Sequence, residues 1–315
     1  MDFSAFRIQQ LQVDRYGLQP LLQEIKDLMP GNAFERQQGV QQLEEVMRRS
    51  QGLVLKRGEQ IVALAVYLIR GNSCRLSFAY ALKGESSQLM LQYLFQGLLS
   101  LAESDPNIDS IRFDIVPWFP LNIELALKEL GFTCVERMLM RRCEAYPIHA
   151  PSLPREIKLV PWDTWLTTPV AQILLLAFGG GFEGSWDRSL KDLSGCKQFL
   201  ADCYSGRFGT FDARISFALQ QENLLIGMSL ASWSTEGEGF IPAFGLLPQF
   251  TGQGLGSIML AHLLKRYGES AFPPQGIELA VSEENHAALH LYQKYGFMEK
   301  SRFRVYYLDI HHQTQ

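Results

Sequence analysis

The most informative part of this sequence is the stretch Pro248-Gln249-Phe250-Thr251-Gly252-Gln253-Gly254-Leu255-Gly256-Ser257. It follows an expected strand at residues 240–247 and opens an expected helix at residues 254–267. Glycines remove side chains that would block close approach, and successive backbone N–H groups at a helix N-terminus can converge on a phosphate. The stretch therefore predicts an anion-binding turn, although many strand-to-helix turns are rich in glycine for steric reasons alone.

Two nucleotide-binding motifs compete for this turn, and both fit it poorly. A dinucleotide-binding fold prefers glycine at position 257 and an acidic residue at the end of the next strand, about 20 residues on. The sequence has Ser257 instead, and its next expected strand ends at Val281-Ser282. A Walker-type phosphate loop requires Gly-Lys-Ser/Thr, which the stretch lacks. Both alternatives therefore lose support.

A second informative stretch lies downstream, at Val281-Ser-Glu-Glu-Asn-His-Ala-Ala-Leu-His-Leu-Tyr-Gln-Lys-Tyr-Gly-Phe297. Asn285 is a favourable N-cap for the helix expected at 285–295, and Gly296 suits its C-terminal end. Tyr292 shares one face of that helix with an alanine and a second tyrosine. A tyrosine in such a stripe usually packs in the core with its hydroxyl satisfied, and a catalytic role is the alternative.

Together the two stretches resemble the acetyl-CoA signatures of the GNAT superfamily of N-acetyltransferases. The first signature runs strand, Pro, Arg/Gln-x-x-Gly-x-Gly/Ala, helix. Residues 251–256 match it at both required glycines, with Thr251 where the family has Arg or Gln. The second signature has an Asn that opens a helix after a strand, and a Tyr ahead of a Gly-Phe pair. The resemblance covers roughly the last half of the chain, from about Glu156 to Ile310.

The resemblance implies acetyl-CoA as cosubstrate and gives roles to particular residues. Tyr292 would lie near the coenzyme A sulfur and protonate the departing thiolate as a general acid. The backbone of the glycine-rich turn would hold the pyrophosphate, and the strand before it would pair with the pantetheine arm in the manner of an added strand. The expected cofactor-binding residues are Leu246, Leu247, Thr251, Gly252, Gln253, Gly254, Leu255, Gly256, Ser257 and Asn285.

Acetylation of an amine also needs a base, for which the sequence offers Glu236, Glu238 and Glu183. Acidic residues in turns are common on solvated surfaces, so none of the three stands out. The loop at residues 179–187 begins with three adjacent glycines and, in this family, would form part of the acceptor site. Its aromatic residues could pack an acceptor or simply anchor the loop. The candidate substrate residues are Phe182, Glu183 and Trp186.

The first half of the chain repeats the same order of elements more faintly, which indicates a duplication. An offset of 165 residues places Gly131-Phe132 on Gly296-Phe297 and Leu127 on Tyr292. Leu127 cannot donate a proton, and Glu85 stands where a phosphate would bind and would repel it. We therefore expect a degenerate copy that keeps the fold and has lost the cofactor.

Three prolines between Tyr146 and Arg155 mark the expected linker, because proline lacks a backbone donor and disfavours helix before it. The predicted organisation is a degenerate GNAT-like domain at residues 1–145, a linker at 146–155 and an acetyl-CoA-binding GNAT domain at 156–315. The predicted fold class is α/β (α+β), with two tandem GNAT-like domains, each a mixed, mostly antiparallel sheet flanked by helices.

The composition restricts the partners. With a formal net charge of −4 and 20% charged residues, the chain has no basic field for nucleic acid or an anionic membrane. Its five cysteines form no CxxC pair, which argues against a disulfide framework or a structural zinc, and no metal site is expected. We find no signal peptide pattern and no apolar run that could span a bilayer, so a cytoplasmic location is expected.

The predicted function is transfer of an acetyl group from acetyl-CoA to a primary amine of a small molecule or peptide. The alternative is a non-catalytic acyl-CoA-binding or regulatory protein on the same fold. Tyr292 beside Asn285 favours the enzyme, whereas Thr251 and the lack of a clear base favour the binding protein.

Overall fold

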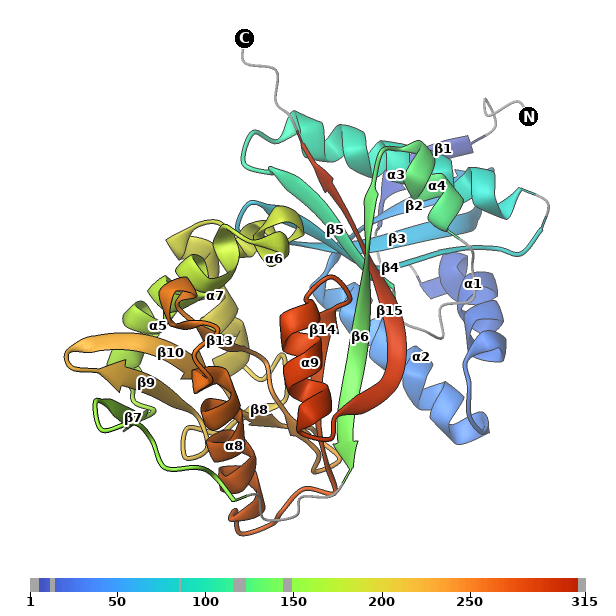
Figure 1. Ribbon diagram of the computed structural model, residues 1–315. Helices are drawn as coiled ribbons and strands as arrows, with labels where there is room; N and C mark the ends of the chain where they lie inside the picture. Colours follow the sequence, from blue (N-terminus) through green and yellow to red (C-terminus); the bar gives the residue numbers. More distant parts are fainter. Residues whose placement is uncertain (1–5, 12–14, 85, 116–122, 144–148, 311–315) are drawn as a thin grey trace. The chain divides into compact units, whose positions relative to one another are not determined.

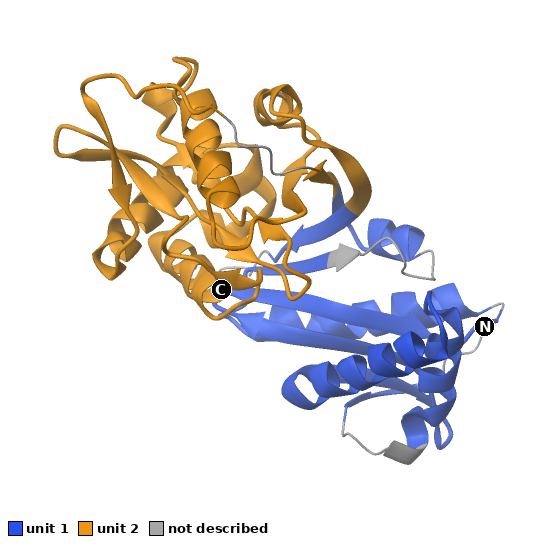
Figure 2. Cartoon of the chain, turned by 90° about the horizontal axis from the view of Figure 1, so that it is seen from below, with its two compact units in different colours: residues 1–134, 304–315 blue, residues 135–303 orange. Residues whose placement is uncertain are grey.

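The computed structural model describes residues 6–11, 15–84, 86–115, 123–143 and 149–310 (Figure 1). The chain forms two compact units (Figure 2): unit 1 comprises residues 1–134 and 304–315, and unit 2 comprises residues 135–303. These ranges differ from the domains expected at 1–145 and 156–315. A strand from the first half of the sequence belongs to unit 2, and the end of the last strand belongs to unit 1. Of the expected linker, residues 146–148 lie outside the described residues.

Unit 1 is a sheet in the order β1-β2-β3-β4-β5-β15, antiparallel except for the parallel pair β4 and β5. Its last strand is the end of β15, where residues 304–309 pair with β5. The elements of unit 1 are β1 (Phe6–Gln10), α1 (Arg15–Leu28), α2 (Ala33–Arg49), β2 (Gln51–Arg57), β3 (Gln60–Arg70), β4 (Ser73–Ala81), α3 (Ser87–Ser104), β5 (Ser110–Ile115) and α4 (Glu124–Glu129).

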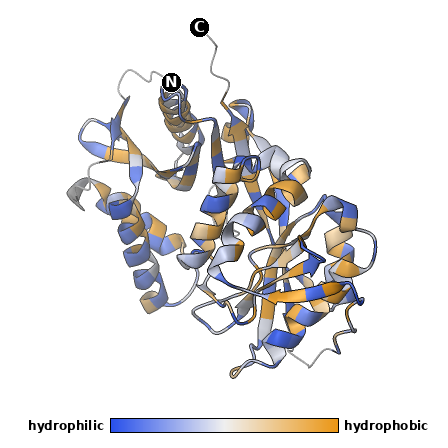
Figure 3. Ribbon diagram, turned by 90° about the vertical axis from the view of Figure 1, so that its left-hand side faces the viewer, coloured by the Kyte–Doolittle hydropathy of each residue, from blue (hydrophilic) through white to orange (hydrophobic). Residues whose placement is uncertain are grey.

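Helices cover both faces of this sheet, so its central strand is apolar without alternation. Residues 61–67 of β3 are all buried. Leu64 and Val66 pack with the apolar residues of α1 and α2, whereas Ala65 and Tyr67 pack with those of α3. A strand covered on both sides reads as a continuous hydrophobic run. Figure 3 shows hydrophobic and hydrophilic residues mixed along the helices, as expected for helices that bury one face.

Unit 2 contains two sheets, in the orders β13-β10-β9-β7 and β6-β14-β12-β11-β8. Phe217 and Leu219 of β9 pack with α8, whereas Ala218 packs with α5 and α7. The elements of unit 2 are β6 (Thr133–Cys143), β7 (Ile157–Pro161), η2 (Thr164–Leu166), α5 (Thr167–Leu174), η3 (Leu175–Gly179), α6 (Phe182–Trp186), η4 (Arg188–Leu190), α7 (Leu193–Tyr204), β8 (Thr210–Phe211), β9 (Phe217–Gln221), β10 (Leu224–Ser229), β11 (Ser232–Trp233), β12 (Gly239–Phe240), β13 (Phe244–Leu246), η5 (Pro248–Phe250), α8 (Leu255–Gly268), β14 (Gly276–Ser282), α9 (His286–Lys294) and the start of β15 (Met298–Asp309).

The predicted fold class is confirmed, and most predicted elements occur close to their expected ranges. One difference matters for function. The strand expected at residues 240–247 is interrupted at Pro242, and its two parts, β12 and β13, join different sheets. Proline cannot donate to a strand ladder, so it favours such a break. The helix expected at 166–178 also changes near its end, where residues 175–179 form a π-helical turn, a feature common at functional sites.

Candidate active site

The two sheets of unit 2 separate beside β13. β12 pairs in parallel with β14, and the Ile241 amide still donates to the Glu278 carbonyl at 2.9 Å. Beyond that point β13 pairs with β10, and no other strand of the described chain pairs with it. β13 and β14 therefore diverge, and one edge of β13 is open to a ligand.

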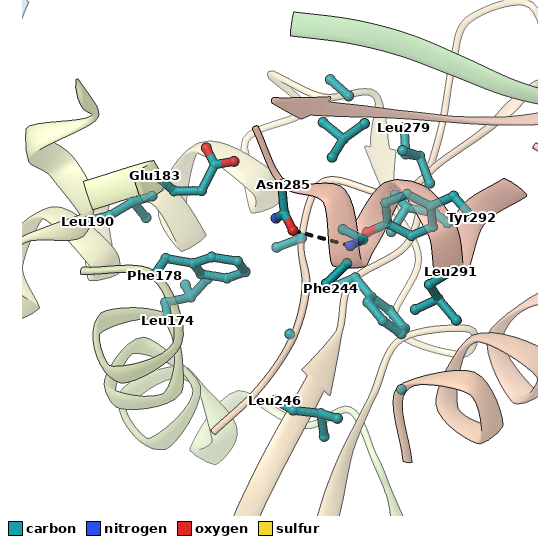
Figure 4. A pocket seen from close by; sticks show the side chains of 18 of the residues that line it. Leu174, Phe178, Glu183, Leu190, Phe244, Leu246, Leu279, Asn285, Leu291 and Tyr292 are labelled. Carbon is teal, nitrogen blue, oxygen red and sulfur yellow. Dashed lines mark hydrogen bonds between the residues drawn. The ribbon is translucent and has the colours of Figure 1, made fainter. Parts of the chain in front are cut away.

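A cavity of about 340 Å³ lies in this divergence, and every residue that lines it belongs to unit 2 (Figure 4). One wall comes from the α5–α6 segment, with Phe178 and Glu183 reaching inward. The opposite wall comes from β13, β14 and α9, with Asn285 and Tyr292. The cavity extends to the glycine-rich turn, where Thr251, Gly252 and Gly256 line it.

The open edge of β13 presents backbone groups at alternate residues. The Leu247 amide donates to the Ile226 carbonyl at 2.8 Å, so the odd-numbered residues of this strand face β10. The N–H and C=O groups of Phe244 and Leu246 consequently point away from β10, toward the cavity. Leu246 lines the cavity. Leu247 does not, because its carbonyl also accepts from the Phe250 amide and its side chain is buried in the core.

The glycine-rich turn owes its shape to backbone conformation. Gly252 and Gly254 have φ of +73° and +79°, and a Cβ added at either would meet nothing within 4 Å. Glycine is required here because other residues rarely adopt positive φ. α8 begins at Leu255, and the Ile258 amide donates to the Gly254 carbonyl at 3.2 Å. Because the first amides of a helix have no acceptor within it, the three preceding N–H groups, from Leu255 to Ser257, can attract an anion.

Hydrogen bonds from side chains stabilise this turn and its surroundings. The Thr251 hydroxyl donates to the Pro248 carbonyl at 2.8 Å, and the Gln253 amide group donates to the Gln249 carbonyl at 2.9 Å. The Ser257 hydroxyl lies 3.0 Å from the Tyr295 hydroxyl and accepts a hydrogen bond from the Lys294 ammonium at 3.2 Å. Lys294, which the sequence analysis did not select, places a positive charge beside the N-terminus of α8.

Tyr292 enters the cavity from α9. Asn285 caps that helix, and its Oδ1 accepts from the Ala288 amide at 3.2 Å, so the capping role expected from its residue type is present. The Tyr292 ring packs against Phe244 and Phe297, with centroids 6.3 and 5.8 Å apart. Its hydroxyl lines the cavity without a hydrogen bond to any described residue.

The charges around Tyr292 are few. Burial raises the pKa of Tyr292 well above its usual range, the Glu183 carboxylate raises it further, and the Arg137 guanidinium offsets part of the shift. Since the ordinary pKa of a tyrosine is already about 10, the phenol keeps its proton at neutral pH. A buried, protonated hydroxyl in a cavity can serve as a proton donor.

Of the three candidate bases, the structure brings one to the cavity. Glu183 lines it, half-buried and close enough to affect Tyr292. Glu238 forms an ion pair with Arg141 at 2.6 Å, and Glu236 is exposed. Neither of these two lines the cavity.

The expected acceptor loop supplies two of its three candidate residues. Trp186 lines the cavity and is 3% exposed, and Glu183 lines it as well. Phe182 is 40% exposed and does not line the cavity.

The sequence analysis did not select Arg137 or Phe178, although both line the cavity. Arg137 lies on β6, in the part of the sequence assigned to the other domain; it donates to the Ala280 carbonyl at 3.1 Å and lies 5.0 Å from the Trp186 ring centroid. Phe178 lies in the π-helical turn and packs on Gly245, where an added Cβ would approach the Phe178 ring to 2.9 Å. A glycine in an interrupted strand can mark such a close approach, and this was the one available hint.

Within the described ranges, no group of three or more His, Cys, Asp or Glu residues is arranged to hold a metal ion. None of the described helices is long and apolar enough to cross a membrane.

Comparisons with known proteins point to one family. Residues 182–297 match the family model described as the acetyltransferase (GNAT) family. No curated protein matches the sequence significantly. Among solved structures, a GCN5-related N-acetyltransferase from Sphaerobacter thermophilus is similar with a TM-score of 0.62 and 18% identity, covering 98% of this chain and 96% of its own.

Two further structures share the fold. A tandem GNAT protein from the clavulanic acid biosynthesis pathway has a TM-score of 0.57 and 13% identity, covering 97% of this chain and 99% of its own. A glucosamine N-acetyltransferase region of a fungal multi-domain β-N-acetylglucosaminidase has a TM-score of 0.60 and 12% identity, covering 96% of this chain and 38% of its own. At such identities the likeness shows the fold alone.

Proposed function

We propose that this chain, in which residues 182–297 are a domain of the acetyltransferase (GNAT) family, transfers an acetyl group from acetyl-CoA to a primary amine of a small molecule or peptide. The family and fold support acyl transfer in general. The observation that carries the finer proposal is the position of Tyr292. Its buried hydroxyl lies in a cavity that reaches from the N-terminus of α8 along the open edge of β13.

The residues present fit coenzyme A. The amides at the start of α8, with the nearby Lys294, suit a pyrophosphate, because a helix N-terminus and a cation both attract an anion. The unpaired edge of β13, at Phe244 and Leu246, suits the amide groups of a pantetheine arm lying as an added strand. When bound, acetyl-CoA supplies the activated acyl group as a thioester.

The chemistry then falls to two side chains of unit 2. Glu183 takes a proton from the acceptor ammonium, which frees the amine to attack the acetyl carbonyl. The carbon–nitrogen bond forms through a tetrahedral species, and the carbon–sulfur bond breaks. Tyr292 gives its proton to the departing sulfur and regains one from the attacking nitrogen through solvent. Glu183 then releases its proton to solvent, and the products are an amide, coenzyme A and that proton, so atoms and charge balance.

Calorimetric titration of acetyl-CoA tests the proposal with a matched pair of variants at Gly252. This residue lines the cavity at φ +73°, a conformation that asparagine and aspartate tolerate better than other side chains. Gly252→Asp and Gly252→Asn have the same shape but differ by one negative charge. We expect one site per wild-type chain, modest weakening in Gly252→Asn, and at least about tenfold further weakening in Gly252→Asp.

Equal affinities of the two variants would mean that the phosphates bind elsewhere, and absence of binding to the wild type would remove the acetyl-CoA assignment. The alternative of a non-catalytic acyl-CoA-binding protein is favoured by Thr251, which directs its hydroxyl to the Pro248 carbonyl and offers no long side chain to a phosphate. Two results together would select that alternative. The wild type would bind acetyl-CoA without transferring the acetyl group to any amine, and Tyr292→Phe would leave the affinity for acetyl-CoA unaltered.

A further inference from the structure

One wall of the cavity, formed by residues 174–199, is mostly apolar (Figure 4). The structure describes all of these residues, and the charged ones that line the cavity are Glu183 and Asp187, both acids. Asp187 is engaged as a cap, because its carboxylate accepts from the Ser189 amide at 3.1 Å and from the Ser189 hydroxyl at 2.5 Å. The apolar lining residues of this wall are Leu174, Phe178, Trp186, Leu190 and Phe199.

Three of these apolar residues, Phe178, Leu190 and Phe199, are half-buried. Each packs against the same core cluster, to which α5 and α7 contribute. Each also lines the cavity, so part of its apolar surface faces the ligand space. Apolar surface in contact with water is unfavourable, and a concave apolar wall therefore favours a ligand group that is apolar as well.

The two phenylalanine rings of this wall are held in place by their neighbours. Phe178 packs on Gly245, where an added Cβ would approach the Phe178 ring to 2.9 Å. The centroid of the Phe199 ring lies 5.5 Å from that of the Phe208 ring. Close packing of this kind restricts the orientation of both rings. The wall is therefore preorganised, and its rings favour an aromatic ligand through offset or edge-to-face contacts.

The apolar wall and the proposed base come from the same segment. Glu183 lies between Phe178 and Leu190 in the sequence, and all three line the cavity opposite Tyr292 (Figure 4). The acceptor nitrogen has to lie beside Glu183 to give up its proton. The rest of the acceptor then lies along the apolar residues on either side of Glu183.

The cation Arg137 lines the cavity from β6 and not from this wall. It donates to the Ala280 carbonyl at 3.1 Å, and its guanidinium lies 5.0 Å from the Trp186 ring centroid and 5.8 Å from that of Phe303. Arg137 thus has partners within the protein, and we assign it to the framework of the cavity.

We propose that the acceptor is an arylalkylamine: a primary amine joined by a short alkyl link to an aromatic ring, with no second charge. Its ring packs among Phe178, Leu190 and Phe199, and its amine lies beside Glu183. This inference rests on the proposed function. The cavity of about 340 Å³ must also admit the end of the pantetheine arm, which favours a single ring over a larger group.

The test compares three acceptors, each offered with acetyl-CoA: 2-phenylethylamine, ethylamine, which lacks the ring, and L-phenylalanine, which adds a carboxylate. The rate of coenzyme A release gives kcat and KM for each. We expect 2-phenylethylamine to exceed ethylamine about tenfold or more in kcat/KM, because only its ring is buried against the wall. It should exceed L-phenylalanine by about as much, because a carboxylate loses its hydration there and is repelled by Glu183.

Leu190→Asn places a polar group of similar size in the wall, and it should bring the ratio between 2-phenylethylamine and ethylamine close to one. Phe199→Leu keeps the wall apolar but removes a ring, so it should lower the ratio less. Leu176→Asn is the matched control, because Leu176 lies in the same segment, is 59% exposed and does not line the cavity. It should keep the wild-type ratio. Calorimetry with acetyl-CoA shows whether each variant is folded and still binds.

A fourth reaction, hexanoyl-CoA with ethylamine, asks whether the wall holds the acyl chain instead. We expect it to be no faster than acetyl-CoA with ethylamine. A faster reaction that Leu190→Asn abolishes would assign the wall to the acyl chain and overturn the proposal.

Ethylamine or L-phenylalanine serving as well as 2-phenylethylamine would also overturn the acceptor assignment and leave the acetyl-CoA site standing. So would the absence of 2-phenylethylamine acetylation by a protein that binds acetyl-CoA, or a wild-type ratio in folded Leu190→Asn and Phe199→Leu. Absence of acetyl-CoA binding to the wild type would remove both proposals.

Discussion

The helices α4 of unit 1 and α9 of unit 2 end in the same way, although their sequences differ. The Phe132 amide donates to the Leu127 carbonyl at 3.0 Å, and the Phe297 amide donates to the Tyr292 carbonyl at 3.0 Å. The glycine before each phenylalanine has positive φ, +84° and +79°. Leu127 and Tyr292 thus occupy the same position in the same cap. The fold was kept in both units, whereas the hydroxyl occurs in one.

The turns before α3 and α8, unlike the two helix ends, differ in their backbone structure. α8 follows two glycines with positive φ and opens toward the cavity. In unit 1 the turn after β4 contains a single glycine, Gly84, and the Lys83 amide donates to the Glu24 carboxylate at 2.7 Å. Tyr80 donates to the same oxygen at 2.6 Å. Unit 1 therefore places a carboxylate of its own at this turn. Glu85, expected to repel a phosphate, lies outside the described residues.

The largest expected effect is on catalysis. Tyr292→Phe removes the hydroxyl that unit 1 lacks, and we expect kcat to fall about 10²–10⁴-fold with little change in the Kd for acetyl-CoA. Steady-state kinetics measures kcat, and calorimetry measures the Kd for acetyl-CoA. Tyr267→Phe is the matched control, because the Tyr267 hydroxyl donates to the Phe240 carbonyl at 2.7 Å away from the cavity. Tyr267→Phe should lower the free energy of unfolding by about 1–3 kcal/mol and leave kcat at the wild-type value. Equal kcat in wild type and Tyr292→Phe would contradict the acid role.

The next effect concerns the residue of unit 1 at the same position. Leu127 is completely buried, so Leu127→Ala should lower the free energy of unfolding by about 2–5 kcal/mol. Urea denaturation measures this loss. Because unit 1 is expected to bind no cofactor, the affinity of the folded variant for acetyl-CoA should equal that of the wild type. A weaker affinity for acetyl-CoA, measured at urea concentrations where the variant is folded, would contradict the expectation that unit 1 binds no cofactor.

A smaller effect is expected at the two shared caps. Gly131→Ala and Gly296→Ala should each cost about 1 kcal/mol, since the positive φ strains any residue with a Cβ. The nearest atoms to an added Cβ are 3.8 Å away at Gly131 and 3.7 Å away at Gly296, so no steric term adds to this cost. Asparagine at either position should cost less than alanine in thermal denaturation. A loss confined to one of the two would show that the caps are not equivalent.

The smallest effect is expected at Gly84. A Cβ there meets nothing within 4 Å, so Gly84→Asp adds a negative charge to unit 1 with room to spare. Acetyl-CoA affinity should stay at the wild-type value in calorimetry, in contrast to Gly252→Asp. A comparable loss in both variants would mean that the cofactor also depends on unit 1.

Local features of the site could be predicted because they depend on neighbours in the sequence. The N-cap at Asn285, the glycine-rich turn before α8, and the end of α9 at Gly296 all rest on hydrogen bonds or dihedral angles spanning a few residues. The placement of Leu247 could not be predicted in this way. Whether its amide faces the cavity or β10 depends on strand register, which a shift of one residue would invert.

The choice among the candidate acids also needed the structure. Glu183, Glu236 and Glu238 look alike in sequence, and they differ only in what lies near them. Glu238 lies beside Arg141, which is 97 residues away in the chain, and Glu183 lies near Tyr292 across the cavity. Such partners are brought together by packing between distant segments.

The sequence by itself determined the family resemblance, the glycine-rich turn, the two helix caps and the position of Tyr292, because each is written in residues that lie close together along the chain. The tertiary structure alone decided which unit each strand joins. Residues 137–143 pair with β14 in unit 2, and residues 304–309 pair with β5 in unit 1. Strand pairing is made by backbone groups that every residue carries, so the partner of a strand is chosen by long-range packing. That choice brings Arg137 into the cavity of unit 2.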